Sequence, residues 1–176
     1  MTLRRALIAY IAGFVATLTL HQGALALMHA LGWTDRMPFA LQPTGPFGLP
    51  QVISLALWGG VWGILMTAVL PRALSNVSYI VAGLGFGAIL PTLIALLVVM
   101  PIKGQPIAGG GDVKIVIGAL ILNGLWGAGT ALFVKLFGPA APSAVLRSVS
   151  SSSGLPLLPR SGPSVTLLKP LSFRPS

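Results

Sequence analysis

The segment ISLALWGGVWGILMTAVL, residues 53–70, carries no charged side chain and decides the fold class. A helix needs about 20 such residues to cross the ~30 Å hydrocarbon core of a bilayer. A strand of a membrane β-barrel would instead alternate polar and apolar residues over about ten positions. The continuous apolar character therefore predicts a membrane-spanning helix at about residues 49–70.

Three further segments, at about residues 6–31, 77–100 and 113–137, are also continuously apolar, with Lys114 and Lys135 near the two ends of the last. Across the chain, 55% of residues are hydrophobic and only 7% are charged, whereas a soluble domain carries roughly 25% charged residues. We therefore expect an all-α fold, a polytopic bundle of four transmembrane helices over residues 1–138.

Prolines and polar residues between these segments indicate where the helices begin and end. Pro50 falls in the first turn of the second predicted helix, where its missing N–H is tolerated. Asn76 is a candidate N-cap for the third helix and Asp112 for the fourth. Pro91 alone lies inside a predicted span, where it should kink the helix and leave the carbonyl near Gly87 without its usual partner.

The composition changes after the fourth segment. Residues 139–176 are rich in Ser and Pro, include SVSSSSG, and show neither helical nor strand periodicity. Such a composition is typical of a disordered, basic tail. We expect a solvated tail, and its cations are available to anionic lipid or to a partner that orders it.

The distribution of basic residues predicts the orientation. Eight Lys and Arg lie on the side of the two termini and three on the other, which places both termini in the cytoplasm. Arg4-Arg5, the apolar run that follows and Ala24-Leu25-Ala26 also resemble a signal peptide. Cleavage after Ala26 would leave three spans, but the apolar character continues to Leu31 and favours an uncleaved helix.

Small residues at four-residue spacing indicate close helix packing. Such residues share one helix face and let another backbone approach. The candidate packing positions are Gly59, Gly63, Gly83, Gly87, Gly124 and Ala128. They fit packing within the bundle, and they also fit contact with a second copy or another membrane subunit.

Aromatic residues near these glycines divide into two predicted groups. Trp58, Trp62 and Trp126 are placed to fill the spaces between helices. Trp33 and Tyr79 lie near predicted helix ends and fit anchors at the membrane–water interface better.

The intramembrane polar residues are His21, Gln22 and Asn123, with His29 closer to a helix end. His21 and His29 are separated by ~12 Å of helical rise, so they cannot share one metal ion. Either one could ligate a haem or pigment. His21, with Gln22, could instead hydrogen-bond another span or belong to a proton path, and His29, nearer the outer interface, could reach the lipid head groups. The span threonines can bond to carbonyls of their own helices and need no other partner.

The types of residue present argue against most kinds of catalytic, metal-binding and ion-coupled site. The chain has no Cys, and its only acidic residues, Asp35 and Asp112, lie outside the predicted spans. Ion-coupled transporters commonly place a carboxylate in the membrane. Ser54, His29 and Asp35 do not show a spacing that favours a hydrolase. We expect no enzyme, no metal, no cofactor and no nucleic-acid partner.

The run from Arg4 to Arg72, which includes HQGALALMHALG and ISLALWGGVWGIL, resembles small uncharacterised inner-membrane proteins of proteobacteria. The resemblance extends to the end of the fourth span and implies a bacterial inner-membrane setting, with no activity attached. Our leading expectation is a non-enzymatic accessory or structural component, in contact with lipids and with itself or other membrane subunits. The alternatives are a small transporter or channel formed by oligomerisation, and a haem- or pigment-binding subunit.

Overall fold

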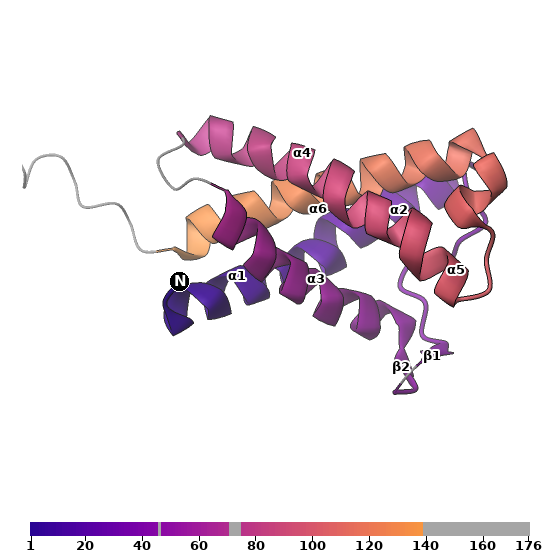
Figure 1. The fold of residues 1–176 in the computed structure, drawn as a ribbon, viewed down its shortest axis with the longest axis horizontal. Coiled ribbons are helices and arrows are strands. Elements are labelled where there is room, and N and C mark those ends of the chain that lie inside the picture. The colour runs from indigo at the N-terminus through magenta and orange to yellow at the C-terminus, as the bar shows by residue number, and fades with distance from the viewer. Residues whose placement is uncertain (46, 71–74, 139–176) are drawn as a thin grey trace, which may run out of the picture. The chain divides into compact units, whose positions relative to one another are not determined.

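The computed structural model describes residues 1–45, 47–70 and 75–138. Within these ranges the chain is an all-α bundle with four helices long and apolar enough to cross a membrane (Figure 1). They span Leu3–Ala30, Gln51–Val69, Asn76–Ile102 and Val113–Phe137. The predicted disorder of residues 139–176 concerns positions outside the described residues.

The first long helix is interrupted by a wider turn. It consists of α1 (Leu3–Ala16), the π-helical segment η1 (Thr17–His21) and α2 (Gln22–Ala30). A π turn takes in about one residue more than an α turn, so the side chains on its two sides are rotated relative to a regular helix. This irregularity is absent from the sequence-based prediction.

A loop with a two-residue ladder connects the first and second long helices. Strands β1 (Pro43–Thr44) and β2 (Leu49–Pro50) pair antiparallel, with Pro43 opposite Pro50. Helix α3 (Gln51–Val69) begins directly after Pro50, which is therefore the residue before the first turn and not inside it.

The third long helix contains a second π turn. It consists of α4 (Asn76–Ile94), η2 (Ala95–Val99) and α5 (Met100–Ile102). Ser75, not Asn76, caps α4: its Oγ accepts a hydrogen bond from the Ser78 N–H at 3.2 Å. The hydroxyl of Ser75 is one residue closer to the loop and meets the orphan N–H of the first turn.

The last connection is glycine-rich. A 3₁₀ segment, η3 (Ile107–Gly111), contains Ala108, Gly109 and Gly110 with positive φ, and α6 (Val113–Phe137) follows. Asp112 caps α6 as predicted, because its carboxylate accepts the Lys114 N–H at 2.8 Å.

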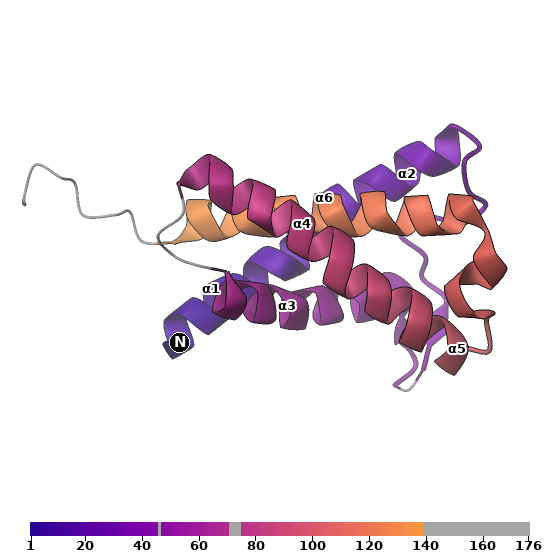
Figure 2. The ribbon, with the colours of Figure 1, turned by 45° about the horizontal axis from the view of Figure 1, so that its top comes forward.

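The helices are arranged as two hairpins (Figure 2). Helix α1 packs along α3, and α4 packs along α6. Helices α1 and α6 join the two hairpins, whereas α3 and α4 have very little contact with each other. We call the end with the N-terminus the N-terminal end, and the end with the β-ladder and η3 the loop end.

The first hairpin is held by backbone-to-backbone contact. Gly13 of α1 lies between Gly59 and Gly63 of α3, and a Cβ on Gly13 would overlap the Gly59 carbonyl. A Cβ on Gly63 would overlap the carbonyl of Ala9. The predicted Gly59–Gly63 pair thus faces α1 of the same chain.

The second hairpin has the same kind of contact, but here the pair of glycines lies on the earlier helix and the single glycine on the later one. Gly127 of α6 lies between Gly83 and Gly87 of α4. A Cβ on Gly83 would come within 2.7 Å of both the Gly127 carbonyl oxygen and the Ala131 Cβ. Gly124 also faces α4, in a looser contact near Ala88, and Ala128 is half-buried.

The core between the hairpins is small and partly aromatic. Its buried members are Ala16, Met66, Tyr79, Phe86, Trp126 and Ala131. Tyr79 is only 4% exposed, so its expected role as an interface anchor is wrong. Its ring lies in the core with the Lys135 Nζ 4.9 Å from the ring centroid. Trp33, by contrast, is exposed near the loop end.

Candidate functional site

A cavity of about 550 Å³ lies where α3 and α4 separate. Residues of η1, α3, α4–η2 and α6 line it, with Thr44 and Gly45 from the loop before α3. Its volume is in the usual range of pockets for small molecules, about 300–1,000 Å³.

Both π turns border this cavity. Thr17 and His21, the first and last residues of η1, line one side, and Ala95 and Val99, the first and last residues of η2, line another. Irregular turns of this kind occur often at functional sites, because they redirect side chains that a regular helix would point elsewhere. Two independent irregularities therefore converge on one space.

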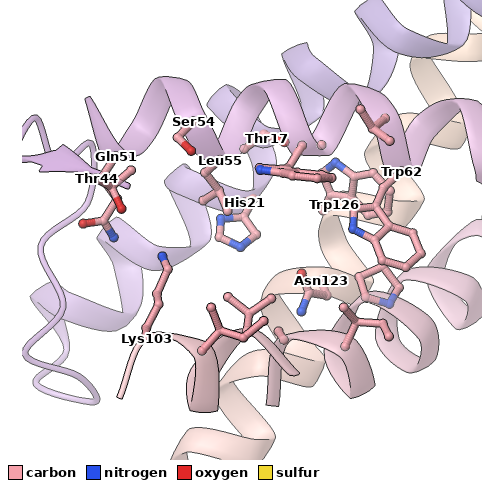
Figure 3. Close-up of a pocket in the computed structure, with 18 of the residues that line it drawn as sticks. Thr17, His21, Thr44, Gln51, Ser54, Leu55, Trp62, Lys103, Asn123 and Trp126 are labelled. Carbon is pink, nitrogen blue, oxygen red and sulfur yellow. The ribbon is translucent and has the colours of Figure 1, made fainter. Parts of the chain in front are cut away.

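The lining changes character along the cavity (Figure 3). Thr44, Gln51 and Lys103 lie together toward one end, while Trp62 and Trp126 lie toward the other, with the His21 ring between them. The polar end is the loop end, because Gln51 begins α3 and Lys103 follows α5. Aliphatic side chains of α3 and of α4–η2 complete the wall: Leu55, Val61, Leu65, Ile94 and Val99.

His21 is the most unusual polar group in the cavity wall. Its Nδ1 is buried and has no hydrogen-bond partner among the residues that the structure describes. An unpaired polar atom inside a bundle costs roughly 1–3 kcal/mol, so such atoms are rare without a reason. The position of His21 at the end of η1 makes its ring available to a molecule in the cavity.

Asn123 lies on the opposite wall, and its side-chain amide already donates a hydrogen bond. Its Nδ2 donates to Thr92 Oγ1 at 3.0 Å, and Thr92 Oγ1 donates to the Ala119 carbonyl at 3.2 Å. The expectation that Thr92 bonds within its own helix is therefore wrong: its hydroxyl crosses to α6, because Asn123 and the Ala119 carbonyl lie opposite it. Asn123 is bonded to Thr92 rather than to His21 or Gln22.

Two hydrogen bonds to one backbone carbonyl hold the aromatic end of the cavity in place. Trp126 Nε1 donates to the Gly13 carbonyl at 3.0 Å, and Thr17 Oγ1 donates to the same oxygen at 2.9 Å. Trp62 meets Phe86 edge to face, with ring centroids 6.2 Å apart. Trp58 also lines the cavity but is 59% exposed, so it does not fill an interhelical space as predicted.

The other two predicted polar residues support the loop instead of the cavity. Gln22 Oε1 accepts the Phe39 N–H at 2.7 Å, and His29 Nδ1 lies 3.1 Å from the Thr34 carbonyl oxygen. Phe39 has a positive φ of 51°, an uncommon backbone conformation that this contact helps to hold. His29 is therefore not part of the site that contains His21.

The sequence reasoning missed Gln51 and Lys103 and treated Ser54 only as a hydrolase candidate. Nothing local distinguishes these residues, because they converge only once the loop and η2 are placed. Within the described part of the chain, no group of three or more His, Cys, Asp or Glu is arranged to hold a metal ion.

Comparisons with known proteins do not add an identity. No protein-family model, curated protein or solved structure matches the chain.

Proposed function

We propose that this protein is a non-enzymatic, multi-pass membrane protein that binds an amphipathic, lipid-like molecule in the cavity between its two hairpins. The observation that carries the proposal is the convergence of η1 and η2 on a space that is polar at one end and aromatic at the other. Helix irregularity is tolerated in a bilayer where it lines a cavity or is buried in protein.

The lining indicates the chemistry of the bound molecule. Lys103, Gln51 and Thr44 offer a cation and hydrogen-bonding groups to a polar or anionic head group at the loop end. The Trp and aliphatic side chains offer apolar surface to the rest of the molecule. The His21 ring lines the cavity part-way along, and a turn of the ring would bring its Nδ1, which lacks a partner among the described residues, to a bound molecule.

The proposal includes an accessory role at a bacterial inner membrane, with both termini in the cytoplasm. The protein would hold its ligand for a larger membrane complex and would not transform it. Its resemblance to small inner-membrane proteins supports the setting, and the excess of basic residues on the side of the termini supports the orientation. The loop end of the cavity then faces the outer leaflet.

Native mass spectrometry of the full chain, released from its own membranes in mild detergent, tests the proposal. Val99 lines the cavity and Val98 does not, although both are partly exposed neighbours on η2. Val99→Trp should narrow the space and reduce the retained lipid-mass ligand by about tenfold, which corresponds to about 1.4 kcal/mol of binding. Val98→Trp should retain the ligand.

The other outcomes are equally informative. Equal retention in the two variants, or a wild-type protein with no bound molecule, would overturn the proposal. An absorption band above the protein range that His21→Leu abolishes would assign the cavity to a pigment. The slight contact of α3 with α4 favours lateral opening, so a transport assay is the next step if the ligand exchanges between leaflets.

A further inference from the structure

A second cavity, of about 410 Å³, lies at the N-terminal end of the bundle. All four long helices contribute to it: Arg5 from α1, Thr67 from α3, Tyr79 from α4 and Lys135 from α6. It shares no lining residue with the cavity that contains His21. Any function that it has is therefore independent of the proposed function above.

Two cations face this cavity. The only acidic side chains of the whole sequence, Asp35 and Asp112, lie at the loop end. The N-termini of α1 and α4 and the C-termini of α3 and α6 meet at the N-terminal end, so their opposite dipoles largely cancel. Arg5 and Lys135 therefore make the electrostatic potential in this cavity positive, and a bound anion would balance their charge.

Thr67 provides an independent sign of a ligand. It is 5% exposed, and its Oγ1 is buried with no hydrogen-bond partner among the described residues. Thr17, Thr19 and Thr130 bond to carbonyls four residues earlier in their helices. Thr67 does not: its hydroxyl is enclosed beside the cavity, and a rotation about χ1 would turn it toward a bound group.

Lys135 is held in place by an aromatic ring. Its Nζ lies 4.9 Å from the centroid of the Tyr79 ring, within the range of a cation–π contact. Lys and Arg both bind phosphate, and Arg can contact two of its oxygens at once. Basic pockets between membrane helices at head-group depth are known binding sites for phospholipid head groups.

We propose that the cavity formed by Arg5, Thr67, Tyr79 and Lys135 binds a phosphate group at the N-terminal end of the bundle. Arg5 and Lys135 neutralise its charge, and Thr67 Oγ1 donates a hydrogen bond. The phosphate belongs either to an anionic phospholipid or to a soluble phosphorylated molecule, and the two sources are separated by experiment.

The sequence offers a matched pair of variants for the test. Arg4 and Arg5 are neighbours in the first turn of α1, but only Arg5 lines the cavity. Full-length protein is reconstituted in nanodiscs with phosphatidylglycerol, with Val99→Trp as background so that ligand retention by the other cavity is reduced. Arg5→Gln and Lys135→Gln should each reduce retained phosphatidylglycerol in native mass spectrometry by about tenfold, as expected for loss of a charge-assisted contact.

Three further variants and a second probe identify the source of the phosphate and the role of the Thr67 hydroxyl. Arg4→Gln and Lys135→Arg should retain the lipid, and Thr67→Val should weaken retention about threefold while raising the thermal stability of the lipid-free protein. In nanodiscs of phosphatidylcholine alone, stabilisation by inorganic phosphate that Arg5→Gln abolishes would identify a soluble source. Equal effects of Arg4→Gln and Arg5→Gln, or no binding of either probe, would overturn the proposal.

Discussion

At the scale of single residues, the absence of a Cβ decides where the helices meet. Gly87 and Gly85 lie two positions apart on α4 and differ completely in surroundings. A Cβ on Gly87 would overlap the Asn123 carbonyl of α6, whereas a Cβ on Gly85 would meet nothing within 4 Å. The chemical identity of the two residues is the same, and only the partner helix distinguishes them.

We expect Gly87→Ala to destabilise the bundle by about 1–3 kcal/mol, because α4 and α6 must separate to admit the methyl group. Gly85→Ala should be neutral or stabilising by up to about 1 kcal/mol, because alanine favours the helix more than glycine does. Equilibrium unfolding of the two variants in mixed micelles with increasing dodecyl sulfate measures the difference. Equal stability of the two variants would contradict the packing of α4 against α6.

At the scale of elements, the sequence predicted what depends on composition and missed what depends on tertiary partners. Continuous apolar runs were enough to predict four helices, and Asp112 was recognisable as a cap because its side chain acts locally. Thr92 and Tyr79 were misplaced because their surroundings come from another helix. Neither π turn has a local signature, and Pro91 precedes η2 without lying in it.

The presence of the π turn η1 predicts how the protein responds to the deletion of one residue. Because a π turn holds about one residue more than an α turn, deleting Leu20 should convert η1 to regular helix and leave α1 and α2 in register. The bundle should keep its stability to within about 1 kcal/mol. Retained ligand in native mass spectrometry should fall, because His21 and Thr17 no longer project into the cavity together.

Deletion of Ile11 is the control for this prediction. Ile11 is exposed in the regular part of α1, between Ala9 and Gly13, which both contact α3. Losing one residue there rotates these two contacts by about 100° relative to each other, so they cannot both face α3 and the variant should unfold. If both deletions unfold the protein equally, η1 is not a removable insertion and its role in shaping the cavity is wrong.

At the scale of the whole molecule, the two cavities lie toward opposite ends of one bundle and differ in charge. The cavity at the loop end has Lys103 in its lining, together with neutral polar and aromatic groups, whereas the cavity at the N-terminal end has Arg5 and Lys135. Inner-leaflet lipids are the usual partners of cations near a cytoplasmic surface. The orientation therefore determines which leaflet supplies each ligand.

The basic residues that the structure describes are divided equally between the two ends of the bundle, so they do not predict its orientation in the membrane. Arg4, Arg5 and Lys135 lie at the N-terminal end, and Arg36, Lys103 and Lys114 at the loop end. The predicted preference for cytoplasmic termini thus depends on Arg72 and on the basic positions after residue 138. Because the sequence has no Cys, single Cys variants report the side of each end without further engineering.

We expect Gln105→Cys, at an exposed loop-end position, to react with a membrane-impermeant maleimide in intact spheroplasts. Thr2→Cys, exposed at the N-terminal end, should react only after the membrane is permeabilised. This result would place Lys103 and the lipid-like ligand at the outer leaflet, and Arg5 and Lys135 among the anionic lipids of the inner leaflet. The reverse pattern would exchange the two leaflets: the cavity with Arg5 and Lys135 would then face away from the cytoplasm. Soluble phosphorylated metabolites would no longer reach that cavity, and an anionic phospholipid would be left as the source of its phosphate.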